Sequence, residues 1–177
     1  MLILASRGIP RLAEHVRGRA VLIPTASEPL ANPGIADEVE RELTAAGLAV
    51  TRIGIDAPLE DANVIAVSGG NPYHLLAEAQ RTGFGLRVRA ALAAGATYVG
   101  YSAGAILAGP TLAPITLTSP FPPPPDLDLT GLALTDVLVL PHHNREGRAE
   151  RHAAAQAVFG DRVPLAPLRD GEYLIRV

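Results

Sequence analysis

The sequence of 177 residues contains no cysteine and no lysine. The absence of cysteine excludes disulfide bonds, zinc–thiolate sites and a thiol nucleophile. The absence of lysine excludes a P-loop lysine, a Schiff-base lysine and a Ser-Lys dyad. If the chain carries a nucleophilic side chain, we therefore expect a serine or a threonine.

The sequence also lacks an excess of positive charge and a long apolar run. The net charge is −3, and 48% of the residues are apolar against 19% charged, a globular composition. No apolar run reaches the roughly 18 residues of a membrane-spanning helix. The first ten residues carry no positive charge before their apolar run, so they resemble a strand rather than a signal peptide. We expect one domain over residues 1–177, in the cytoplasm, with neither nucleic acid nor membrane as a partner.

Short β-rich runs alternate with stretches of helical periodicity in the first two thirds of the chain. Strands are expected at 2–5, 20–24, 49–55, 64–67 and 97–101, and helices at 11–17, 35–47, from 72 onward and at 86–94. This alternation predicts an α/β fold with a mostly parallel sheet and helices on both faces. Ligand sites of such sheets lie at the carboxyl ends of the strands.

The remainder of the chain does not continue this regular alternation of strands and helices. Residues 110–118 resemble a strand or hairpin, and the proline-rich run 120–125 predicts a stiff, exposed connector or, less favoured, a docking site for a partner. A further strand is expected at 137–140, a helix at 146–159 and a last strand at 173–177.

The strongest motif is Gly100-Tyr101-Ser102-Ala103-Gly104, which fits G-x-S-x-G between a predicted strand and a predicted helix. A serine on such a sharp turn adopts a strained backbone, and glycines two residues away on either side let the chain pass without a clash. The turn lifts the serine oxygen from the sheet and directs the helix N-terminus towards a developing oxyanion. The alternative is a small-residue turn that only lets the strand and helix pack closely.

A second motif, Ser68-Gly69-Gly70-Asn71, follows another predicted strand. A glycine pair at a strand end can turn backbone N–H groups towards a ligand, and so could supply half of an oxyanion hole. It could equally be a tight turn capped by Asn71, with Pro72 as the first helical residue.

A general base for a serine is sought among the five histidines. His142 and His143 follow a predicted strand, whereas His15, His74 and His152 lie in helical patterns and are expected to be surface or packing residues. Imidazole titrates near neutrality, which suits a general base. A metal site of His142, His143 and His152 is disfavoured because the spacing matches no familiar ligand pattern.

Arginines cluster at Arg145, Arg148 and Arg151. Arg148 and Arg151 are one helical turn apart and can share a face, and a guanidinium suits bidentate binding of a carboxylate. The alternative is a solvated helix face on which Glu146 and Glu150 are ordinary partners.

Four blocks of sequence occur together and in order: IPTAS at 23–27, VSGGNPYHLL at 67–76, YVGYSAGAILAGP at 98–110 and LPHHN at 140–144. Over nearly the whole chain they resemble the peptidase E (α-aspartyl dipeptidase) family of serine peptidases, to which cyanophycinases are related. The resemblance implies a class I glutamine amidotransferase-like fold and hydrolysis of dipeptides with an N-terminal aspartate. It also implies that no metal or cofactor is needed and that a homodimer forms.

The resemblance assigns roles to individual residues. Ser102 matches the family nucleophile, His142 the base, and Gly70 and Ala103 the oxyanion donors. Arg148, with Arg145 as second choice, matches the arginine that recognises the acidic side chain. We place Asn71 with these arginines as a candidate substrate-binding residue.

The sequence departs from the family in its third catalytic residue. The family commonly has an aspartate shortly after the elbow, but residues 111–120 contain no acid. We predict that Asp170 takes this role, with Glu172 and Asp126 as alternatives. An acid is needed because it fixes the histidine tautomer and stabilises the imidazolium.

Two other functions remain open from the sequence. One is a serine hydrolase of another peptide or of an aspartyl polymer, as in cyanophycinases. The other is a non-catalytic binding module on the same fold, which the missing acid after the elbow would allow. An amidotransferase-like subunit using glutamine is disfavoured because the nucleophile is serine rather than cysteine.

Overall fold

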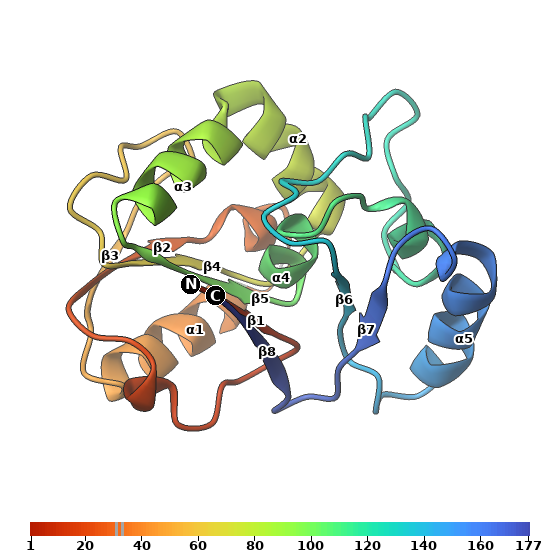
Figure 1. Cartoon of the computed structure of the whole chain (residues 1–177), viewed down its shortest axis with the longest axis horizontal. Coiled ribbons are helices and arrows are strands. Elements are labelled where there is room, and N and C mark those ends of the chain that lie inside the picture. Colours follow the sequence, from red (N-terminus) through yellow and green to blue (C-terminus); the bar gives the residue numbers. More distant parts are fainter. Residues whose placement is uncertain (31, 33) are drawn as a thin grey trace.

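A computed structural model describes residues 1–30, 32 and 34–177. Its centre is a six-stranded sheet of order β3-β2-β4-β5-β1-β8 (Figure 1). The strands are β1 (Leu2–Ala5), β2 (Arg19–Ile23), β3 (Ala49–Arg52), β4 (Val64–Val67), β5 (Thr97–Tyr101) and β8 (Tyr173–Arg176). All neighbours are parallel except β8, which runs antiparallel to β1 at the edge.

Helices cover both faces of this sheet, which confirms the predicted α/β architecture. Helix α1 (Gly34–Ala45) lies on one face, and α2 (Pro72–Thr82) and α3 (Phe84–Ala93) lie on the other (Figure 1). The short helix α4 (Ala103–Leu107) begins directly after β5. As predicted, Asn71 caps α2, and its side chain accepts hydrogen bonds from the backbone N–H groups of Tyr73 and His74.

The buried side chains form two clusters, one on each side of the sheet. Along β1, Ile3 and Ala5 face the α1 side, whereas Leu2 and Leu4 face the side of α2 and α4. This alternation is the period-two pattern of a strand buried on both faces, and the apolar composition of the central strands follows from it.

The chain after α4 forms a separate layer beside the sheet. It contains the 3₁₀ helix η3 (Ala113–Leu117), the parallel pair β6 (Leu138–Leu140) and β7 (Leu165–Pro167), and helix α5 (Arg148–Phe159). In Figure 1, β6, β7 and α5 lie on the side of the sheet where β8 is placed.

The prediction for residues 110–118 was wrong. The segment forms η3 rather than a strand, with Pro114 in its first turn, and only Thr111 makes an isolated bridge, to Thr130. Alternating apolar residues alone do not distinguish a strand from a short helix that packs against a neighbour, here α5. Strand β7 was not predicted, because a strand of three residues that follows one proline and ends on another gives little periodicity.

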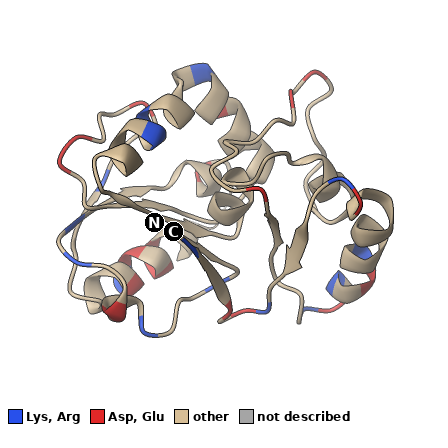
Figure 2. Cartoon of the chain, viewed as in Figure 1, with Lys and Arg blue, Asp and Glu red and all other residues tan. Residues whose placement is uncertain are grey.

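Charged residues lie on the helices α1, α2, α3 and α5 and on the loops, and the central strands are almost free of them (Figure 2). Within the described residues, no helix is long and apolar enough to cross a membrane.

Candidate active site

Ser102 occupies a sharp turn between β5 and α4. Its backbone has φ 48° and ψ −103°, an unfavourable conformation for a residue with a side chain. The two flanking glycines make the turn possible. A Cβ on Gly100 would lie 2.6 Å from the backbone of Gly104, and a Cβ on Gly104 would lie 2.3 Å from the Val67 carbonyl oxygen. The glycines are therefore needed for close backbone approach, as the motif predicted.

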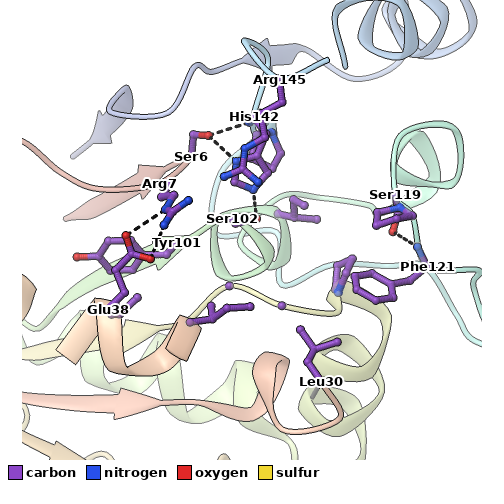
Figure 3. Close-up of a pocket in the computed structure, with 18 of the residues that line it drawn as sticks. Ser6, Arg7, Leu30, Glu38, Tyr101, Ser102, Ser119, Phe121, His142 and Arg145 are labelled. Carbon is purple, nitrogen blue, oxygen red and sulfur yellow. Dashed lines mark hydrogen bonds and ion pairs between the residues drawn. The ribbon is translucent and has the colours of Figure 1, made fainter. Parts of the chain in front are cut away.

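A chain of hydrogen bonds runs from Ser102 through His142 to Asp170. The Ser102 Oγ lies 2.9 Å from His142 Nε2 (Figure 3). On the other side of the ring, His142 Nδ1 lies 2.6 Å from Asp170 Oδ1. Because an ionised carboxylate only accepts hydrogen bonds, Nδ1 carries the proton and Nε2 can accept from the serine hydroxyl.

The histidine and the aspartate come from two loops of the second layer. His142 follows β6 with φ 66°, and Asp170 lies in the turn between β7 and β8. The Asn144 side chain accepts a hydrogen bond from the Asp170 backbone N–H at 2.9 Å, and the His143 N–H donates to the Leu168 carbonyl. These contacts hold the two loops in a fixed position relative to each other.

The surroundings favour a neutral imidazole beside an ionised carboxylate. Burial lowers the pKa of His142 below its ordinary value, against the hydrogen bond to Asp170, and the charges of Arg145 and Arg148 lower it further. Burial alone would raise the pKa of Asp170, but hydrogen bonds from His142, Ser6 and Arg145 lower it. A neutral imidazole can accept the serine proton, as a general base requires.

Ser102 opens into a cavity of about 530 Å³, a size typical of small-molecule sites. Arg145 and Arg148 line one part of it, and an apolar wall of Leu30, Ile115 and Phe121 lines another. Figure 3 shows Leu30 and Phe121 on the side away from Arg145. Phe121 belongs to the proline-rich run 120–125, so this connector contributes directly to the cavity.

The two candidate oxyanion donors lie on either side of the elbow. Gly70 lines the cavity with φ 141°, and a Cβ there would lie 2.0 Å from the Ala26 carbonyl oxygen. Ala103 is the first residue of α4, so its N–H has no partner within the helix.

The candidate substrate-binding residues have different partners. Arg145 donates to Asp170 Oδ2 at 2.9 Å and is thereby engaged with the histidine–aspartate pair. Arg148 donates to the Thr118 carbonyl, and none of the ion pairs among the described residues includes it. Asn71 uses its side-chain oxygen as the cap of α2, and the described lining of the cavity does not include it.

The other acids considered from the sequence make no described hydrogen bond to His142. Glu172 accepts from the Arg169 backbone N–H at 2.7 Å, and Asp126 is exposed in the loop after the proline run. The structure thus brings Asp170, and neither of these two, to His142.

The remaining histidines take no part in this chain of hydrogen bonds. His152 of α5 is buried and stacks on His143, with the two Nδ1 atoms 3.0 Å apart. Burial, together with the charges of His143 and Arg148, lowers the pKa of His152 to about 4. Within the described part of the chain, no three His, Asp or Glu side chains are grouped as metal ligands.

Sequence reasoning missed Ser6, Arg7 and Glu38, which also line the cavity. The Arg7 guanidinium makes a two-pronged ion pair with Glu38, at 3.0 and 2.9 Å. A usable signal existed for Ser6, because it follows a buried strand of a parallel sheet as Ser68 and Ser102 do.

The chain is similar to known proteins in sequence and in fold. Curated relatives include a peptidase E of Salmonella arizonae, 37% identical over 70% of this chain and 56% of the relative. An uncharacterised peptidase of Listeria innocua is 33% identical over 73% of this chain and 67% of the relative. The chain thus spans little more than half the length of the Salmonella relative.

Among solved structures, a protein of Listeria monocytogenes EGD-e assigned to peptidase E superposes with a TM-score of 0.81 and 28% identity. That match covers 97% of this chain and 91% of the other. A peptidase from an acI-B1 actinobacterium, 19% identical, shares the fold with a TM-score of 0.68 over 96% and 80% of the two chains. Residues 5–177 match the family described as peptidase family S51, and the chain belongs to that family.

Proposed function

We propose that this chain is a serine peptidase that hydrolyses short peptides with an N-terminal aspartate. The observation that carries the proposal is the hydrogen-bonded series Ser102–His142–Asp170 at the wall of a cavity. A serine hydroxyl is a weak nucleophile unless a base takes its proton, and a base works best when a third group orients it.

In the proposed reaction, His142 Nε2 takes the hydroxyl proton while Ser102 Oγ attacks the peptide carbonyl carbon. Asp170 holds the Nδ1 proton and stabilises the imidazolium that forms. The imidazolium then protonates the leaving amine, which leaves an acyl-enzyme on Ser102. Water, deprotonated by the same imidazole, attacks the ester and releases the first residue.

Backbone N–H groups at the elbow are suited to the charge that develops on the carbonyl oxygen. Ala103 is at the N-terminus of α4, where the helix has unpaired donors, and Gly70 lies on the facing loop. We assign the oxyanion hole to these two groups.

Arg148 is our choice for the residue that binds the acidic side chain of the substrate. Burial and the neighbouring charges of Arg151 and Arg145 lower its pKa, so this half-buried cation lies in a site that favours an anion. Arg145 already shares Asp170 and Arg7 is paired with Glu38, which leaves Arg148 as the cavity-lining guanidinium with capacity for a carboxylate.

The first test compares hydrolysis of Asp-Leu, Ala-Leu and Leu-Leu by the wild type and by Ser102→Ala. We expect cleavage of Asp-Leu in preference to the other two, and a loss of several powers of ten in rate for Ser102→Ala. Arg148→Gln should lower kcat/KM for Asp-Leu by about 10- to 100-fold and change that for Ala-Leu much less.

Labelling with a serine-directed phosphonate separates the alternatives. Labelling of Ser102 without dipeptide cleavage would indicate another peptide or an aspartyl polymer as substrate. No labelling and no cleavage would contradict the proposal and favour a binding module. The homodimer implied by the resemblance stays a prediction, and light scattering on the purified chain measures it.

A further inference from the structure

Ser6 lies directly behind the His142–Asp170 pair. It is the first residue after β1, and its side chain is completely buried. Its Oγ lies 2.9 Å from Asp170 Oδ1 and 2.8 Å from the His142 backbone nitrogen. Because the His142 N–H can only donate, Ser6 Oγ accepts there and directs its own proton to the carboxylate.

Ser6 therefore connects three parts of the chain that are far apart in sequence. The backbone of Ser6 and of the next residue also bonds to the β7–β8 turn. The Ser6 N–H donates to the Glu172 carbonyl, and the Gly171 N–H donates to the Arg7 carbonyl. The strand β1 is part of the central sheet, whereas His142 and Asp170 lie in loops of the second layer.

We propose that Ser6 is a positioning residue of the peptidase reaction, through its hydrogen bonds to His142 and Asp170. This inference rests on the proposed function of the site. His142 has φ 66°, a conformation that a non-glycine residue adopts only when its surroundings hold it there. The hydrogen bond from the His142 N–H to Ser6 Oγ is one contact that holds the backbone in place at His142 itself.

The same hydroxyl fixes the carboxylate. Asp170 Oδ1 accepts from both His142 Nδ1 and Ser6 Oγ, while Oδ2 accepts from Arg145. Both oxygens thus have defined partners, so the carboxylate plane cannot rotate without breaking one of these bonds. Without the hydroxyl, Oδ1 loses one of its two donors, and the imidazole loses part of the support that directs Nε2 at Ser102.

The experiment compares Ser6→Ala and Ser6→Cys with the wild type. Both variants remove a strong hydroxyl donor, and the cysteine variant keeps nearly the original volume. We expect kcat for Asp-Leu to fall by about 10- to 100-fold while KM changes by about twofold or less, because the group acts through His142 and Asp170 rather than on the substrate.

A second readout does not depend on activity. A histidine Nδ1 proton in a short hydrogen bond to a carboxylate resonates far downfield in the proton NMR spectrum, and His142→Asn identifies that signal by removing it. We expect the signal in the wild type and expect it to shift upfield or disappear in both Ser6 variants. If the wild type hydrolyses no peptide, the proposed function fails while this signal still tests the role of Ser6.

Ser27→Ala is the matched control. Ser27 is also a buried serine, but among the residues that the structure describes its hydroxyl bonds only to the local Pro24 carbonyl, at 2.7 Å. We expect this variant to keep the wild-type kcat and the downfield signal. Either Ser6 variant retaining both the wild-type kcat and an unshifted signal would overturn the proposal.

Discussion

The two parts of this molecule contribute to the candidate site in different ways. Residues 1–107 form five of the six strands of the main sheet and its helices, and they present Ser102 on a turn defined by nearby glycines. Residues 108–177 form the second layer and the edge strand β8, and they supply His142, Asp170 and Arg148 from loops and the start of α5. The nucleophile thus depends on local backbone geometry, and its partners depend on contacts between distant segments.

Because of this difference, we expect the two parts to be sensitive to different kinds of substitution. Around Ser102, the chain is so closely packed that even a methyl group has no space beside Gly104. Around His142, the geometry depends on polar contacts with residues far along the chain, such as Ser6, 136 positions away. Substitutions that change packing should therefore disturb the geometry around Ser102. Substitutions of single polar groups should disturb the geometry around His142.

The largest expected effect is that of Asp170→Asn. An amide cannot hold the Nδ1 proton as the carboxylate does, so the wrong tautomer of His142 would face Ser102. By analogy with other serine triads, kcat for Asp-Leu should fall about 10⁴-fold. Steady-state kinetics measure this effect. Glu172→Gln, two residues away, is the control and should stay near wild type, and the reverse ranking would make Glu172 the functional acid.

A substitution in the first part tests the role of packing. In Gly104→Ala, the new Cβ would lie 2.3 Å from the Val67 carbonyl oxygen, so β4 or α4 must shift. We expect a loss of about 3 kcal/mol or more in the free energy of unfolding. Urea denaturation measures it. Gly83→Ala, at φ 65° but with open space around it, should cost only about 1 kcal/mol, and equal costs would argue against close approach as the cause.

The histidine pair between the β6 loop and α5 provides the third test. His152 has a pKa of about 4 in the folded chain against an ordinary value of 6.5. The unfolded chain therefore takes up the proton first as the pH falls, and stability is lost below about pH 6.5 until the folded pKa is reached. Between pH 7 and pH 5 this difference in pKa lowers the free energy of unfolding by about 2 kcal/mol.

His152→Phe should remove this contribution, because phenylalanine keeps the ring packing and has no proton to gain. The measurement is urea unfolding of both proteins at pH 7 and pH 5. The wild type should lose more stability than the variant over that interval. An equal loss in both would show that His152 is not the group responsible.

The sequence predicted the first part of the molecule well, and in the second part it predicted β6, α5 and β8 but neither η3 nor β7. The strand, glycine turn and helix around Ser102 were predictable because they follow from residues within a few positions of one another. Residues 110–118 were misjudged because their fold depends on packing against α5. Strand β7 escaped notice for a similar reason, since it forms only by pairing with β6.

The amino-acid sequence by itself determined the α/β alternation, the elbow that carries Ser102, and the restriction to a serine or threonine nucleophile, because composition and short-range pattern suffice for these. The tertiary structure alone decided that Asp170 rather than Glu172 meets His142, that Arg145 pairs with Asp170 while Arg148 donates to the Thr118 carbonyl, and that Ser6 Oγ contacts both His142 and Asp170. Such contacts join residues far apart in the chain, and only the folding of the second layer against the sheet edge brings their atoms within hydrogen-bonding distance.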